Sequence, residues 1–169
     1  MRLAAAIALD AAAVQPCIVH DRTFLLVQRY DRATNGSGRI RQVPREDFCQ
    51  AFGVPPETKY AGESGPTFKD CFALIRHVAA RSAVDILKLL DAVIFNLIAG
   101  YTDAYRKNFL ILYDTEVLRL APLFDLLALV AYRDLSPKFV MKIGNVQYSR
   151  SWIPRAGQNS WLTQAWVCR

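Results

Sequence analysis

The feature that most constrains the fold is a long apolar stretch that leads directly into a short polar segment. From Ser82 to Ala99, apolar residues recur at the three-to-four-residue spacing of a core helix, and the polar segment Gly100–Asn108 follows at once. Two short apolar runs, Phe109–Tyr113 and Val117–Leu120, come next and predict a hairpin. We therefore expect a core helix, then a polar loop, then a hairpin.

The polar loop and the segment after the hairpin contain residue types suited to phosphoryl transfer. Four residues separate Asp103 from Asn108, and Asp125 follows the hairpin. Enzymes of the protein-kinase type place a base and two metal ligands in this order. Asp103 would accept the proton of the attacking hydroxyl, while Asn108 and Asp125 would hold Mg²⁺, which prefers oxygen ligands.

Each of these residues also has an ordinary structural interpretation. An Asp and an Asn at this spacing fit a solvated carboxylate at the end of a helix and an amide in a turn. Asp125 precedes the apolar residues 126–131 and could be a helix N-cap, a metal ligand, or both. The order of the surrounding elements favours the phosphoryl-transfer site.

Length and composition predict a single folded domain. The chain has 169 residues, 53% of them hydrophobic, which is enough for one core. The net charge of +6 fits an anionic partner such as a nucleotide or RNA, although scattered arginines also fit a solvated basic surface. The four cysteines form no Cys-x-x-Cys pair, so we expect a reducing, cytoplasmic setting without a zinc site. The run Ile86–Ala99 is too short and too charged to span a bilayer, and no membrane partner is expected.

Local patterns predict an α+β fold that is mainly helical. The continuous apolar run Phe24–Val27 indicates a buried strand, paired with Cys17–His20. Pro44 and the acids after it indicate the first turn of a helix. Thr67 and Asp70 have the spacing of a capping box at the start of the next helix. Asn96 lies among apolar residues of the long helix and would need a hydrogen-bond partner.

Several segments resemble, in order, the C-terminal part of HipA-type serine/threonine kinases, the toxins of bacterial type II toxin–antitoxin modules. They are Leu25–Arg32, Val43–Gln50, Lys59–Tyr60 with Gly65–Pro66, Thr102–Phe109, Leu120–Asp125 and Lys138–Gly144. The resemblance covers residues 1–144 and implies a protein-kinase-like large lobe with a remnant of the small lobe. Residues 145–169 do not resemble the family, and tryptophans among polar residues there indicate a divergent tail that is poorly packed, or else a partner-binding segment.

The resemblance also implies residue roles, cofactors and partners. It makes Asp103 the catalytic base and Asn108 and Asp125 the Mg²⁺ ligands. The backbone of Gln28, Arg29 and Tyr30 would line the adenine pocket of ATP, and Lys107 would support the phosphates. The implied partners are a helix-turn-helix antitoxin, DNA only through that antitoxin, and a protein substrate such as an aminoacyl-tRNA synthetase.

The sequence departs from the family pattern at two places in the loop and at its start. Tyr105 stands where the family usually has His, and Tyr101 stands where it often has Asn. The family's Gly-rich phosphate loop and strand lysine are expected before Met1. We therefore expect a kinase fragment or half of a split kinase, with poor activity alone. The alternatives are a non-catalytic module that holds an antitoxin, or a decayed remnant.

Overall fold

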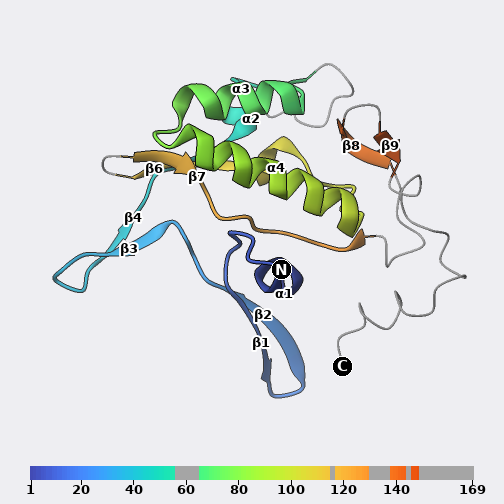
Figure 1. Ribbon diagram of the computed structural model, residues 1–169. Helices are drawn as coiled ribbons and strands as arrows, with labels where there is room; N and C mark the ends of the chain where they lie inside the picture. Colours follow the sequence, from blue (N-terminus) through green and yellow to red (C-terminus); the bar gives the residue numbers. More distant parts are fainter. Residues whose placement is uncertain (56–64, 115–116, 130–137, 144–145, 149–169) are drawn as a thin grey trace, which may run out of the picture.

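The computed structural model describes residues 1–55, 65–114, 117–129, 138–143 and 146–148. Its central part is a three-stranded antiparallel sheet covered by two long helices (Figure 1). The sheet has the order β5-β6-β7, formed by β5 (Arg45–Asp47), β6 (Leu110–Asp114) and β7 (Val117–Leu120). Helices α3 (Phe68–Val78) and α4 (Ser82–Ala99) pack against each other and against β7. The predicted core helix and the hairpin after the polar loop are both confirmed.

Apolar side chains of the two long helices meet in the core, as their spacing predicts. Ile75 of α3 and Leu89 of α4 are fully buried, and Val93 is almost so. The predicted face of α4 is too wide, however, because Leu90, Ile94 and Ile98 lie exposed along one side of the helix. The core therefore covers a narrower stripe of α4 than its apolar composition indicates.

The N-terminal third forms a short helix and two hairpins. These elements are α1 (Arg2–Ala6), β1 (Val14–Val19) paired with β2 (Arg22–Val27), and β3 (Arg32–Thr34) paired with β4 (Ile40–Gln42). The two strands predicted around the turn at His20 are thus confirmed.

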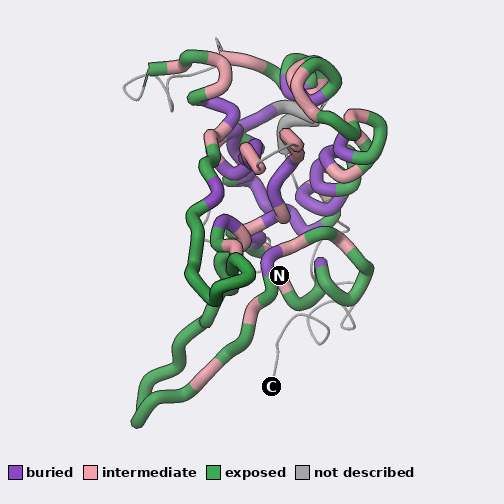
Figure 2. Tube along the Cα trace, turned by 90° about the vertical axis from the view of Figure 1, so that its left-hand side faces the viewer, coloured by how far each residue is buried: buried purple, intermediate pink, exposed green. Residues whose placement is uncertain are grey.

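The prediction that the second of these strands is buried is wrong. All six residues of β2 are exposed, and Leu25 is 59% accessible. The hairpin projects away from the core and is exposed along most of its length (Figure 2). Within the described residues β1 and β2 pair only with each other, and the apolar side chains of β2 remain exposed because they contribute to no buried core.

The helix predicted to open at Pro44 begins later. Arg45–Asp47 form strand β5, in which Glu46 pairs with Ile111 of β6. Only then does helix α2 (Phe48–Ala51) begin, with Asp47 as its N-cap and Gln50 completing a capping box. Pairing with a distant strand overrides the local helix signal. The α+β class is confirmed, but "mainly helical" is wrong, since strands occupy nearly as much of the described chain as helices.

Two further strands close the described part of the chain. Strand β8 (Lys138–Ile143) pairs with β9 (Val146–Tyr148). Most of the predicted poorly packed tail, residues 149–169, lies outside the described residues. Among the helices that the structure describes, none is long and apolar enough to cross a membrane.

Candidate active site

The polar loop begins where helix α4 ends in a left-handed glycine. Gly100 has a φ of 61°, a conformation that glycine adopts without a Cβ clash. The amide of Gly100 donates to the carbonyl of Leu97, and the amide of Tyr101 donates to that of Asn96 at 2.9 Å. This pair of bonds is a Schellman ending. It turns the chain sharply, and the Tyr101 side chain enters the core, where it is 1% exposed.

The rest of the loop is held on both sides of Asp103. The amide of Val140 in β8 donates to the carbonyl of Thr102 at 3.0 Å. On the other side, a 3-10 helix η2 (Arg106–Asn108) leads into Phe109, whose ring packs between Phe48 and Phe68 at centroid distances of 5.7 and 6.2 Å. Asp103 itself is exposed. A rigid loop thus presents the predicted base to solvent.

The segment that contains Asp125 is fixed to the start of the chain. Leu123 forms a parallel bridge with Ala11, donating to the carbonyl of Asp10 and accepting from the amide of Ala12, both at 2.7 Å. Asp125 has a φ of 53°, a left-handed conformation that Asp tolerates better than most residues. No helix begins at Asp125 in the described chain, so the structure does not use it as a helix N-cap.

The hydroxyl of Tyr101 brings the two predicted metal ligands together. It donates to Oδ2 of Asp125 at 3.3 Å and accepts from Nδ2 of Asn108 at 2.7 Å. Burial, and then the negative charges of Asp125 and Asp103, raise the pKa of Tyr101 well above its usual range. Two of the three predicted site residues, Asn108 and Asp125, therefore contact this hydroxyl, and the charge of Asp103 acts on it without a hydrogen bond. Sequence reasoning noted Tyr101 only as a bulky departure from the family pattern.

The donor atoms at this place fit Mg²⁺. Asn108 offers an amide oxygen and Asp125 a carboxylate, both hard ligands. The described residues contain no group of three or more His, Cys, Asp or Glu side chains that could hold a metal. One carboxylate with one amide fits an ion that takes its remaining ligands from water and substrate phosphates, as Mg²⁺ does.

The segment predicted to line the adenine pocket lies beside the site. The ring of Tyr30 packs on that of Phe124, the neighbour of Asp125, with centroids 6.0 Å apart. The amide of Gln28 donates to the carbonyl of Ala13 at 2.9 Å, so its N–H is already used in the hairpin. The Arg29 side chain turns to Asp31, with Nη2 and Oδ2 2.6 Å apart.

The buried carboxylate of Asp31, next to the segment Gln28–Tyr30, is held by several arginines. Asp31 is fully buried and forms ion pairs with Arg29, Arg32 and Arg45 at 2.6, 2.9 and 3.5 Å. The hydrogen bonds from Arg29 and the charges of the arginines lower the pKa of Asp31 to about 2. Asp31 and Arg32 belong to a segment that carries the family resemblance, but residue spacing does not predict that three arginines converge on one acid.

Lys107 lies on η2 between Asn108 and the buried Arg106, and its side chain is half-buried. Arg106 donates to the carbonyl of Pro66 at 2.6 Å and to the hydroxyl of Tyr105, while its Nε has no partner among the described residues. The structure thus places Lys107 next to a predicted metal ligand. Its role toward phosphates stays a prediction.

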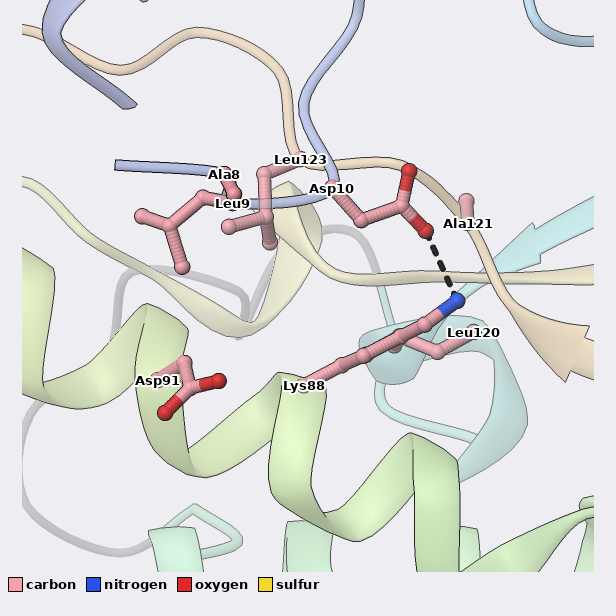
Figure 3. A pocket seen from close by; sticks show the side chains of 8 residues that line it. All are labelled: Ala8, Leu9, Asp10, Lys88, Asp91, Leu120, Ala121 and Leu123. Atoms are coloured by element: carbon pink, nitrogen blue, oxygen red, sulfur yellow. Dashed lines mark hydrogen bonds and ion pairs between the residues drawn. The ribbon is translucent and has the colours of Figure 1, made fainter. Parts of the chain in front are cut away.

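A separate shallow pocket lies between the start of the chain and α4 (Figure 3). Lys88 crosses it, with Nζ 2.7 Å from Oδ2 of Asp10. None of the predicted site residues lines it; the lining residues are Ala8, Leu9, Asp10, Lys88, Asp91, Leu120, Ala121 and Leu123.

The fold matches part of a HipA chain. The structure of a complex of HipA, HipB and operator DNA from Shewanella oneidensis superposes with a TM-score of 0.80 at 26% identity, over 89% of this chain. The family described as HipA-like C-terminal domain matches residues 1–166, and the chain belongs to that family.

Two curated relatives agree with this assignment. A Sinorhizobium fredii protein named "Putative kinase Y4mE" is 62% identical over 144 residues, 85% of this chain. The serine/threonine-protein kinase toxin HipA of Shewanella oneidensis is 29% identical over 156 residues, again 85% of this chain. The chain spans 34% and 36% of the length of these relatives, and 38% of the HipA chain in the solved complex.

Proposed function

We propose that this chain contributes the base and the metal ligands of a HipA-type serine/threonine-protein kinase. The observation that carries the proposal is the convergence of Asn108 and Asp125 on the hydroxyl of Tyr101, with Asp103 close enough to act on the same group electrostatically. The contact of Asn108 with Asp125 through one hydroxyl supports a shared metal site, and the order base, ligand, ligand along the chain is that of phosphoryl-transfer enzymes.

Each residue has a definite task in this proposal. The exposed carboxylate of Asp103 accepts the proton of a serine or threonine hydroxyl while the hydroxyl oxygen bonds to the γ-phosphorus of ATP, the bond from that phosphorus to the bridging oxygen breaks, and ADP leaves. Oxygens of Asn108 and Asp125 hold Mg²⁺, which when bound neutralises charge on the phosphates. Lys107 approaches the phosphates from η2. Of the segment Gln28–Tyr30, the Tyr30 end lies nearest the site, through its contact with Phe124, and backbone groups there contact adenine.

The same proposal names partners by class. The solved relative is a complex with HipB and operator DNA, and we infer an antitoxin of that type as the partner of this chain, with DNA contacted only through it. The inferred substrate is a protein hydroxyl, with an aminoacyl-tRNA synthetase as the target class that the family resemblance implies.

A second candidate function is a non-catalytic module that holds an antitoxin. The observation in its favour is the likeness to a HipA chain that was solved in complex with HipB, of which this chain covers 38%. Kinase catalysis is mostly positioning and charge stabilisation. A module that binds an antitoxin without positioning ATP would therefore phosphorylate poorly.

A chimera separates the two functions. Residues 1–144 of this chain would replace the matching region of the 62%-identical relative, and the purified chimera would be assayed with ATP, Mg²⁺ and a protein acceptor. We expect phosphorylation by the chimera, a loss of at least about a hundredfold on Asp103→Asn, and little activity from the chain alone.

Three outcomes would decide the matter. An inactive chimera beside an active parent relative would contradict the catalytic proposal, and antitoxin binding by that chimera would favour the binding module. Activity that survives Asp103→Asn would remove Asp103 as the base. Rapid phosphorylation by the chain alone would show that it contains its own phosphate-binding elements.

A further inference from the structure

We propose that the Tyr101 hydroxyl is a positioning group that orients both Mg²⁺ ligands before the ion binds. The inference rests on the proposed function, because it assigns Asn108 and Asp125 to the cation. It goes further by adding Tyr101, whose hydroxyl contacts both ligands and acts on them only through hydrogen bonds.

The direction of the hydrogen bonds follows from the proton count. A phenol has one proton to donate, and an ionised carboxylate can only accept. The Tyr101 hydroxyl therefore donates to Asp125, and its contact with Asn108 must be one in which the amide Nδ2 donates. Because Nδ2 and Oδ1 lie on opposite sides of the amide carbon, Oδ1 of Asn108 turns away from Tyr101. That oxygen is the atom that Mg²⁺ requires.

Asp125 needs such a tether more than Asn108 does. It is exposed, has a left-handed backbone, and lies in a segment, residues 124–128, without helix or strand. Its Oδ2 accepts the hydrogen bond from Tyr101, which leaves Oδ1 of Asp125 to bind the cation together with Oδ1 of Asn108. Tyr101 in turn is rigid, because its ring is buried and its backbone closes the Schellman ending of α4. The end of the core helix thus sets the geometry of the ligands.

This arrangement predicts a measurable effect on metal affinity. Groups that orient metal ligands typically cost about 10- to 100-fold in affinity when removed. Tyr101→Phe removes the hydroxyl and keeps the ring in the core. Tyr105→Phe is the matched control, since Tyr105 is another buried tyrosine of the same loop, and its hydroxyl accepts from Arg106 instead of contacting the ligands.

The experiment measures Mn²⁺ binding, as a paramagnetic probe for the Mg²⁺ site, by electron paramagnetic resonance on the full chain. We expect saturable binding that Asp125→Ala abolishes. The Mn²⁺ affinity of Tyr101→Phe should be lower than that of wild type by about tenfold or more, and that of Tyr105→Phe should be unchanged. A second readout is the side-chain amide resonance of Asn108 in the metal-free protein, which should shift in Tyr101→Phe and stay in place in Tyr105→Phe.

The outcomes distinguish failure of this inference from failure of the proposed function. If the wild-type chain binds no Mn²⁺, or if Asp125→Ala binds as well as wild type, the metal site itself is wrong. If wild type binds and Tyr101→Phe binds equally, the positioning role is wrong while the site stands. Tighter binding by Tyr101→Phe would also overturn the inference, because the hydroxyl would then occupy the place of the cation.

Discussion

Asp31 is a buried acid that three arginines surround, and it shows what a sequence leaves undetermined at the scale of one residue. Asp103, Asn108 and Asp125 could be proposed as candidate site residues because residue type and order carry that signal. The ion pairs of Asp31 could not be predicted, since Arg45 reaches it from strand β5. Likewise the buried carboxylate of Asp85 in α4 accepts from the amide of Leu120, a contact that depends on how the helix lies against β7.

Two outcomes at this scale differ from expectation in an instructive way. Asn96 was predicted to need a hydrogen-bond partner, yet its buried Oδ1 has none among the described residues. Its backbone carbonyl instead accepts from Tyr101 and helps to end the helix. The hydroxyl of Tyr101 could be identified as part of the site only after the chain around it was folded.

Asp31→Asn should destabilise the protein at neutral pH by a few kcal/mol, because three guanidinium groups lose their counter-charge. The folded pKa is depressed to about 2 from 3.8. Its contribution is therefore present above pH 4 and is lost as pH falls toward 2. Urea unfolding at several pH values should show the difference in free energy of unfolding between wild type and variant decreasing over that range. The control is Asp91→Asn, on the exposed side of α4, and a difference that persists below pH 2 would contradict the prediction.

The start of α3 could be predicted from the local sequence, whereas the pairing of β5 with β6 could not. The capping box of α3 is local: Thr67 and Asp70 are three residues apart, and the Thr67 amide donates to Oδ2 of Asp70 at 2.7 Å. Strand β5 depends on β6, which lies some sixty residues later in the chain. A helix signal at Pro44 was therefore outweighed by a partner that a local reading does not include.

Thr67→Ala should lower the free energy of unfolding by about 1 kcal/mol, because the side chain that accepts from the Asp70 amide is lost. Arg81→Ala is the matched change at the start of α4, where the N-cap residue makes no side-chain capping bond. Thermal unfolding followed by circular dichroism measures both. Equal losses for the two variants would show that the capping box contributes no stability.

Burial is a property of the whole molecule, and apolar runs in the sequence predict it only in part. Phe24–Val27 and the apolar face of α4 look alike as hydrophobic runs. Only α4 has other layers against it, so Leu89 is fully buried while Leu25 is mostly exposed. Burial of an apolar side chain is favourable, but whether the side chain is buried depends on how the other elements pack against it.

Leu89→Ala should therefore cost about 2–5 kcal/mol of stability, as a cavity in a packed core does. Leu25→Ala, the same chemical change on the projecting hairpin, should stay within about 0.5 kcal/mol. Urea denaturation of the two variants beside wild type gives both values. A large loss of stability for Leu25→Ala would mean that the hairpin is covered in solution, by a second copy of the chain or by another part of the same chain.

The regular register of the β1–β2 hairpin determines which of its two edges can accept another strand. The bond from Gln28 to Ala13 fixes the alternation of hydrogen-bonded pairs, and this places Pro16 opposite Leu25 in a pair without cross-strand bonds. The nitrogen of Pro16 therefore faces the outer edge of β1, where it has no hydrogen to donate. Leu25 presents an intact N–H and carbonyl at the outer edge of β2. A strand that joined this hairpin would add beside β2, the strand whose end leads to Tyr30 and the site.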